Sequence, residues 1–124
     1  MQKAAQTYSK TAQATANPRE LEAQLLMRAA AKLQAVKDGE VTGAVEVISA
    51  VRYNRRLWLV FADSIGQPEN PLPREIKQNL ANLAMFVVKH SMSFETATEP
   101  KPERLGVLIN INREIAAGLR AKAA

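Results

Sequence analysis

The sequence predicts an all-α fold: a single bundle of four main antiparallel helices, preceded by a short N-terminal helix or arm. Aromatic residues make up only 5% of the chain while alanine is abundant, which favours closely packed helices over a β-sandwich. Apolar residues recur at intervals of three and four in four long segments, and short links between them make neighbours antiparallel. A chain of 124 residues is long enough for one domain with a core and too short for two ordinary ones. We therefore divide it into an arm of residues 1–16 and a bundle of residues 17–124.

The arm carries a sparse apolar stripe that includes Tyr8. A helix this short is marginal in water unless it packs against something. Two interpretations stay open: a frayed terminus, or an arm that orders on a partner or on the bundle, with Tyr8 as its anchor. The first residues contain no long apolar run, so we do not expect a secretory signal peptide.

The first main helix is predicted to begin at Asn17-Pro18-Arg19-Glu20. Asn17 is a favoured cap, Pro18 suits the first helical position, and Glu20 stands at capping-box spacing. Gly39 supplies a left-handed stop. The helix is expected to bury the apolar residues that recur every three or four positions: Leu21, Leu25, Ala29, Leu33 and Val36.

The second helix is predicted to start near residues 41–43 and to end near residues 65–66. Its first turns are rich in β-branched residues, so a strand is the alternative. The apolar stripe continues for about 20 residues, whereas strands rarely exceed about 10. The length of the stripe therefore favours a helix.

A turn over residues 67–71 precedes the third helix, which is expected to start at Leu72 and to end loosely at residues 91–93. Its apolar surface widens from Leu83 to Val88, so we expect this part to be covered on more than one side.

Residues 96–104 contain two prolines and are typical of an exposed linker. The last helix is predicted over about residues 102–120. Arg120 near its end suits the negative pole of the helix dipole.

The chain is organised around residues 50–63, which read AVRYNRRLWLVFAD. Asn54 and Arg55 fall in the middle of the apolar stripe of this helix, where a plain core helix would carry Leu or Ala. The last helix repeats the pattern, because Asn112, followed by Arg113, interrupts its stripe. We predict that these two helices carry a polar layer inside an otherwise apolar bundle.

These polar residues allow three interpretations. In the favoured one, Asn54 and Asn112 are hydrogen-bonded within the bundle and fix helix register, since a buried amide left unpaired costs about 1–3 kcal/mol. In the second, Asn54, Arg55 and Trp58 line a groove that binds the backbone or helix end of a partner. An arginine head must reach water or a carboxylate, and Trp beside Arg is typical of interface anchors. In the third, RNA bases stack on Tyr53 and Trp58, although RNA platforms usually show more aromatics and clustered charge.

Composition and motifs argue against an enzyme. The chain has no cysteine, so a disulfide, a thiolate nucleophile and a Cys-based metal site are all excluded. Its single histidine, His90, has no second ligand at metal-binding spacing and is expected to be a helix-terminal cation or a packing residue. No catalytic triad, phosphate loop or HExxH pattern is present, so we assign no catalytic, cofactor-binding or metal-ligating residues.

The net charge of +5 and the pI near 9.8 are compatible with an acidic partner or RNA, but the charges do not cluster. The longest uninterrupted apolar run, residues 57–62, is far shorter than the about 20 residues that cross a bilayer, so no membrane insertion is expected. The lack of cysteine makes the cytoplasm the default compartment.

Four short motifs follow one another along the chain. The first is Tyr8 with Pro18-Arg19-Glu20 ten residues later and then Glu22; the second is Tyr53-Asn54-Arg55-Arg56-Leu57-Trp58. The third joins Leu72-Pro73 and Asn82-Leu83-Ala84 to His90, and the fourth is Ile111-Asn112-Arg113-Glu114-Ile115 with Gly118-Leu119. In this order they resemble, over nearly the whole chain, the FlaF family of flagellar biosynthesis regulators of alphaproteobacteria. One departure is Asn17, where the family commonly has Ser; both residues cap helices.

The resemblance implies a role in flagellin homeostasis, as a cytoplasmic secretion chaperone that binds flagellin before export and couples its synthesis to export. The family acts alongside the regulator FlbT, which limits flagellin synthesis. The candidate partner contacts are Tyr8, Asn54, Arg55, Trp58, Asn112 and Arg113.

Two alternative functions are kept. One is an RNA-associated post-transcriptional regulator of flagellin mRNA acting with FlbT, with phosphates bound by Arg52, Arg55, Arg56 and Lys101. The other is an adaptor that binds FlbT and no flagellin.

Overall fold

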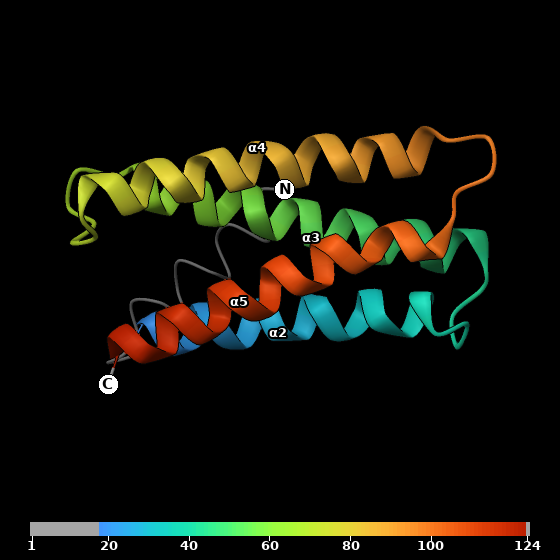
Figure 1. Cartoon of the computed structure of the whole chain (residues 1–124), viewed down its shortest axis with the longest axis horizontal. Helices are drawn as coiled ribbons and strands as arrows, with labels where there is room; N and C mark the ends of the chain where they lie inside the picture. Colours follow the sequence, from blue (N-terminus) through green and yellow to red (C-terminus); the bar gives the residue numbers. More distant parts are fainter. Residues whose placement is uncertain (1–17, 124) are drawn as a thin grey trace.

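The computed structural model describes residues 18–123, which form four α-helices arranged as one bundle (Figure 1). They are α2 (Pro18–Lys37), α3 (Ala44–Gly66), α4 (Arg74–Thr96) and α5 (Gly106–Ala123), and a short 3₁₀ helix, η1 (Pro102–Leu105), precedes α5. Successive helices run in opposite directions, and the described residues contain no strand. The all-α prediction is therefore confirmed, while the predicted arm of residues 1–16 and the cap at Asn17 lie outside the described residues.

The helices pack as two pairs, α2 against α5 and α3 against α4, and α2 also borders α3 (Figure 1). Three alanines on the buried face of α2, Ala23, Ala29 and Ala30, are at most 1% exposed. Small side chains let neighbouring helix axes approach closely, which is why the alanine-rich helix makes the most extensive helix–helix contact.

The turn after α2 confirms the predicted role of Gly39. Its φ of 79° lies in the left-handed region, and its N–H donates to Val36 O at 3.1 Å while Glu40 N–H donates to Ala35 O at 2.9 Å. These two bonds are the pair that defines a Schellman motif. They occupy carbonyls that α2 would otherwise leave unpaired, and they turn the chain back toward α3.

The third helix is longer than predicted at its C-terminal end. It begins at Arg74 and runs through the serine-containing stretch at residues 91–93 to Thr96. The Ser91 hydroxyl donates to Val88 O at 2.9 Å within the helix, and Phe94 is buried in the core at 1% exposure. Because the hydroxyl is satisfied locally and Phe94 contributes apolar burial, packing overrides the weak local signal to stop.

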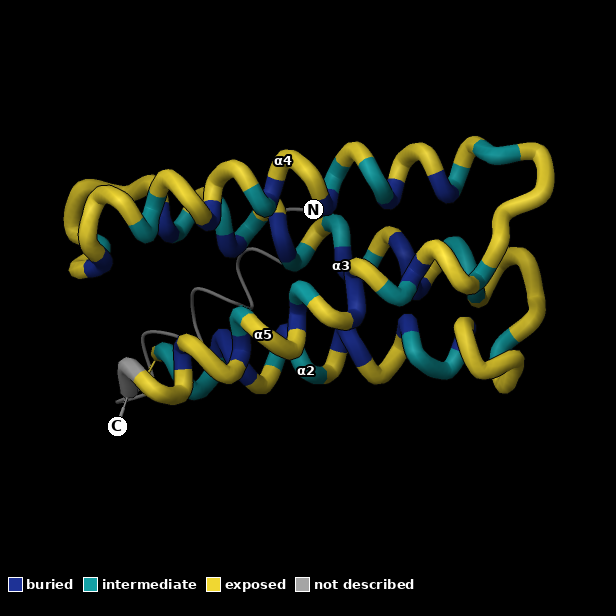
Figure 2. The backbone as a smooth tube through the Cα atoms, viewed as in Figure 1, coloured by how far each residue is buried: buried dark blue, intermediate teal, exposed yellow. Residues whose placement is uncertain are grey.

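The buried face of α2 is wider than the predicted stripe. Ala29, Leu33 and Val36 are buried as expected, but Leu21 and Leu25 are only partly buried. A helix that contacts both α3 and α5 must present a broad apolar surface rather than a narrow line. Figure 2 shows buried segments facing the interior of the bundle and exposed ones on its outer surfaces.

Candidate functional site

A buried polar layer crosses the bundle where the sequence predicted one. Asn54 and Trp58 of α3 and Asn112 of α5 are each 0% exposed. Trp58 Nε1 donates to Asn112 Oδ1 at 2.8 Å, and Asn112 Nδ2 donates to Asn54 Oδ1 at 2.7 Å. The same amide nitrogen donates to Leu26 O of α2 at 3.1 Å. The layer therefore joins α3 to α5 through side chains and reaches α2 through a main-chain carbonyl, and the prediction of a polar layer is confirmed.

The tryptophan fixes the direction of the whole chain of hydrogen bonds. An indole N–H can only donate, so the atom of Asn112 that faces Trp58 must be its oxygen. The Asn112 nitrogen then points to Asn54, whose facing atom must in turn be its own oxygen. Phe61 packs edge-on against the indole, with ring centroids 5.5 Å apart and planes at 80°, which holds the ring in place.

The two asparagines differ in how well they are satisfied. Asn112 uses its oxygen and its nitrogen in three hydrogen bonds, each contributing about 0.5–1.5 kcal/mol net. Asn54 Nδ2, by contrast, is buried with no hydrogen-bond partner among the described residues. An unpaired buried amide donor costs about 1–3 kcal/mol, so Asn112 is the stabilising centre of the layer.

The polar layer specifies how the helices align. A shift of α5 by one residue moves Asn112 by about 1.5 Å along the helix and turns it by about 100°. Trp58 Nε1 and Asn54 Oδ1 would then face hydrocarbon without partners. Each unpaired group carries a desolvation penalty, so alternative registers are disfavoured.

Three of the six predicted partner contacts, Asn54, Trp58 and Asn112, lie inside the bundle. Asn54, Trp58 and Asn112 have no exposed fraction, so they line no open groove on the described molecule. Contact between them and a partner requires the bundle to open, and their role in binding stays a prediction. The RNA platform of Tyr53 and Trp58 is likewise not open to a partner, because only Tyr53 reaches the surface. The Lys32 ammonium lies over the Tyr53 ring, 5.1 Å from its centroid.

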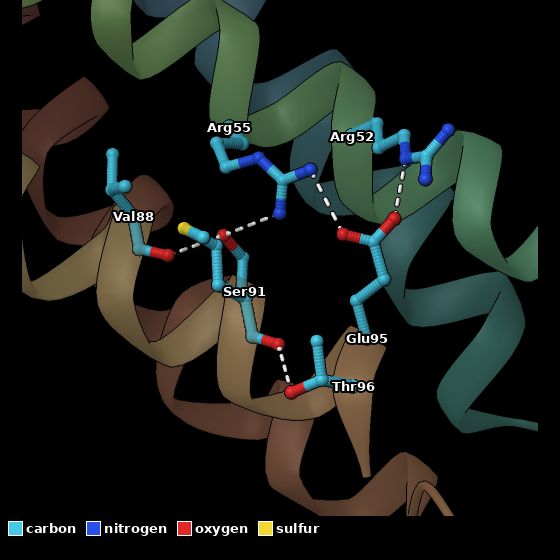
Figure 3. A network of polar contacts seen from close by, with 7 residues as sticks. Arg52, Arg55, Val88, Ser91, Glu95 and Thr96 are labelled. Atoms are coloured by element: carbon cyan, nitrogen blue, oxygen red, sulfur yellow. Dashed lines mark hydrogen bonds and ion pairs between the residues drawn. The ribbon is translucent and has the colours of Figure 1, made fainter.

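Arg55 lies on the α4 side of α3, where it enters a second polar network (Figure 3). Its Nη2 lies 2.9 Å from Glu95 Oε2, and its Nη1 makes a longer contact of 3.5 Å with the Ser91 hydroxyl. Arg52 forms an ion pair with the other oxygen of Glu95. The expectation that the Arg55 head must reach water or a carboxylate is confirmed, and the carboxylate belongs to the neighbouring helix.

The two arginines decide the ionisation of Glu95. Partial burial acts to raise the pKa of the Glu95 carboxyl, but hydrogen bonds from Arg55 and Arg52, together with their positive charges, outweigh it. The pKa of Glu95 is therefore held below its usual value. The carboxylate stays charged at neutral pH and links α3 to α4 through both arginines.

Arg113 repeats the arrangement of Arg55 on the other pair of helices. It is exposed, and its Nη2 donates to Gln34 Oε1 of α2 at 3.3 Å. In both Asn–Arg pairs the asparagine enters the core while the arginine reaches across to a neighbouring helix. The two arginines contact different helices, so the structure does not bring Arg55 and Arg113 into one site, and Tyr8 lies outside the described residues.

Two of the four cations considered for RNA are already paired within the bundle. Arg52 and Arg55 share Glu95, which neutralises part of their charge, whereas Arg56 on α3 and Lys101 in the linker are exposed.

Among the described residues no group of three or more His, Asp or Glu could hold a metal ion. None of the helices in that part of the chain combines the length and the hydropathy needed to span a bilayer.

Sequence reasoning missed the exposed apolar side chains of α4. Met85, Phe86 and Met92 are 59%, 43% and 51% exposed, although the widened apolar surface of this helix was expected to be covered. The described bundle covers only one side of that surface. The signal in the sequence was the scarcity of charge: between Lys77 and Glu95 the only charged residue is Lys89.

Taken together, the described residues define an antiparallel four-helix bundle whose polar side chains join helices and whose third helix keeps an uncovered apolar side. Residues 4–119 match the model of a family described as flagellar protein FlaF, and the chain belongs to that family. Comparison with curated proteins found no match, and neither did comparison with solved structures.

Proposed function

We propose that this flagellar protein is a non-enzymatic cytoplasmic chaperone that binds flagellin before export and couples its synthesis to export. The observation that carries the proposal is the apolar surface left open by the bundle. On α4, three large apolar side chains are more than a third exposed, and they are Met85, Phe86 and Met92. A contiguous group of such residues on a folded protein is characteristic of a surface that meets a partner.

Flagellin offers a ligand that suits a helical surface. Its terminal segments are amphipathic and disordered in the monomer, and they would polymerise or be degraded if left uncovered. A helical protein sequesters such a segment when the apolar face of the segment folds as a helix against it. Ordering the segment costs about 2–5 kcal/mol, so the affinity is moderate and release to the export machinery is feasible.

Calorimetric titration of the full chain with monomeric flagellin tests the proposal. We expect saturable binding with a dissociation constant in the micromolar range and a negative heat-capacity change, because apolar surface is buried. Absence of binding at tens of micromolar of both proteins would overturn the proposal.

RNA binding with FlbT is the second candidate, supported by the net charge of +5. It ranks second because Glu95 already neutralises part of the charge of two of the four candidate cations. Binding to the leader of flagellin mRNA with a steep salt dependence would favour it. Co-purification with FlbT but not with flagellin would instead favour the adaptor.

A further inference from the structure

The solvent-facing side of α4 differs from the exposed sides expected of a surface helix. Met85, Lys89 and Met92 follow one another at intervals of four and three, and Phe86 lies beside them, so the four side chains share one face. We call these four residues the α4 outer face. Solvent-facing positions of a surface helix normally carry many charged residues, but here Lys89 is the only charge among three exposed large apolar side chains.

We propose that the α4 outer face is the docking surface for an amphipathic helix of the partner that carries an acidic side chain next to its apolar stripe. The acidic side chain pairs with Lys89, and the apolar stripe covers Met85, Phe86 and Met92. The identification of this partner with flagellin rests on the function proposed above.

Contacts within the bundle hold the Phe86 side chain of this face in place. The Phe86 ring stacks on His90, with centroids 5.4 Å apart and planes at 20°. His90 Nε2 lies 2.7 Å from Arg104 O, and because a carbonyl only accepts, this nitrogen donates. Phe86 is thus positioned through His90 by the segment that leads into α5, so little conformational entropy is lost when it is covered.

The methionines supply the adaptable part of the face. Met85 and Met92 are the two exposed methionines of the described residues, and they flank Lys89. An unbranched thioether side chain adjusts to different apolar shapes at little cost. A rigid phenylalanine next to two flexible methionines suits a helical ligand whose apolar stripe is not perfectly regular.

Charge argues against a second copy of the chain as the occupant. In a symmetric dimer the same patch meets itself, so two copies of Lys89 would approach each other. The stretch from Gln78 to Phe94 holds no acidic residue to offset them, and Glu95 is already paired with Arg52 and Arg55. Like charges at an interface are unfavourable, so self-association through this face is disfavoured.

Charge also argues against the first residues of the chain as the occupant. Residues 1–17 contain Lys3 and Lys10 and no acidic residue. They therefore carry no carboxylate that could pair with Lys89, which forms no ion pair within residues 18–123. A partner with an acidic side chain beside its apolar stripe therefore suits Lys89 better than this segment does.

Calorimetric titration of full-length variants with monomeric flagellin tests this inference. Met85→Ser with Met92→Ser should weaken binding at least about tenfold, because two apolar contacts are lost. Lys89→Glu should weaken it several-fold and reduce its dependence on salt. The matched control is Val45→Ser on α3, which is 78% exposed and outside the face, and which should leave binding unchanged. Circular dichroism should show the same helix content for every variant, since all four side chains are exposed.

The outcomes separate the two proposals. If the unaltered protein does not bind flagellin, the proposed function fails, and this inference fails with it. If it binds and the α4 variants bind as well as Val45→Ser, only the docking surface is wrong. If sedimentation shows a dimer that the methionine variant dissociates, the face is an interface between copies of this chain, and the inference is overturned.

Discussion

The side chains of Trp58, Asn54 and Asn112 show how one donor-only group can dictate the orientation of an entire buried network. The indole N–H faces the Asn112 oxygen, which turns the Asn112 nitrogen toward both Asn54 and Leu26 O. The network is directional and asymmetric, since both polar atoms of the Asn112 side chain are hydrogen-bonded while Asn54 keeps an unpaired buried nitrogen. This asymmetry leads to a quantitative expectation for two similar substitutions.

Asn112→Leu is expected to lower the free energy of unfolding by about 2–4 kcal/mol, because Trp58 Nε1 and Asn54 Oδ1 lose their partner in the core. Asn54→Leu should lower the free energy of unfolding by at least about 1 kcal/mol less than Asn112→Leu does. It removes an unsatisfied donor, and Asn112 keeps its hydrogen bonds to Trp58 and Leu26 O. Urea unfolding of both variants measures the difference. Equal losses would show that the network is not organised around Asn112.

Glu95 links stability to pH. A carboxyl whose pKa is lowered by folding stabilises the protein above its unfolded pKa of about 4.3 and loses that contribution as pH falls through its folded value. Glu95→Gln should therefore reduce the free energy of unfolding at pH 7 by about 1–2 kcal/mol. This loss lies between the one typical of breaking an exposed ion pair and the one typical of breaking a buried ion pair. The gap between variant and parent should shrink as the pH drops below about 4.3.

Denaturation at several pH values tests this expectation. Glu99→Gln, an exposed change in the linker before η1, is the control and should alter stability by less than about 0.5 kcal/mol. A gap between Glu95→Gln and the parent that does not change with pH would contradict the ionic role of Glu95.

The positions of Asn54 and Asn112 could be predicted because a polar residue that interrupts a helical apolar stripe is visible in the sequence. Their partner Leu26 O could not, since the alignment between helices is decided by packing and not within any one helix. Glu95 was missed as the partner of Arg55 for the same reason. The two residues are 40 positions apart and meet only when α4 folds back on α3.

At the scale of the helices, a helix end could be predicted where the backbone conformation restricts which residue fits. It could not be predicted where the local sequence preference to stop is weak. Gly39 takes up a left-handed conformation that few other residues tolerate, so its role could be inferred from its type and place. The end of α4 was misplaced because local hydroxyl residues suggested a stop, while burial of Phe94 continued the helix to Thr96. Tertiary packing decides where local preferences are weak.

Gly39→Ala should destabilise the protein by about 1–2 kcal/mol. Nothing lies within 4 Å of an added Cβ at this position, so the cost comes from the left-handed backbone alone. Gly118→Ala is the matched control, because it too meets open space but lies inside α5, where Ala is a better helix former by about 1 kcal/mol. Thermal unfolding should therefore show opposite shifts, and a loss of stability in both variants would refute the assignment.

At the scale of the molecule, the residues that hold the bundle together differ from those proposed to meet a partner. The aromatic and polar residues that stand out in the sequence, Trp58, Asn54 and Asn112, hold the helices together inside. The residues proposed to meet flagellin are less conspicuous methionines and a phenylalanine on α4. The sequence could show that α4 carries excess apolar residues, but only the arrangement of all four helices determines which of them stay uncovered.

Hydrogen exchange of the full chain with and without monomeric flagellin tests the central claim most directly. We expect flagellin to slow exchange along residues 78–94 of α4, while amides around Trp58 and Asn112 keep the protection of a closed core. Unchanged exchange in α4 together with faster exchange around Trp58 and Asn112 would show that flagellin opens the bundle and binds its interior, which would contradict this account.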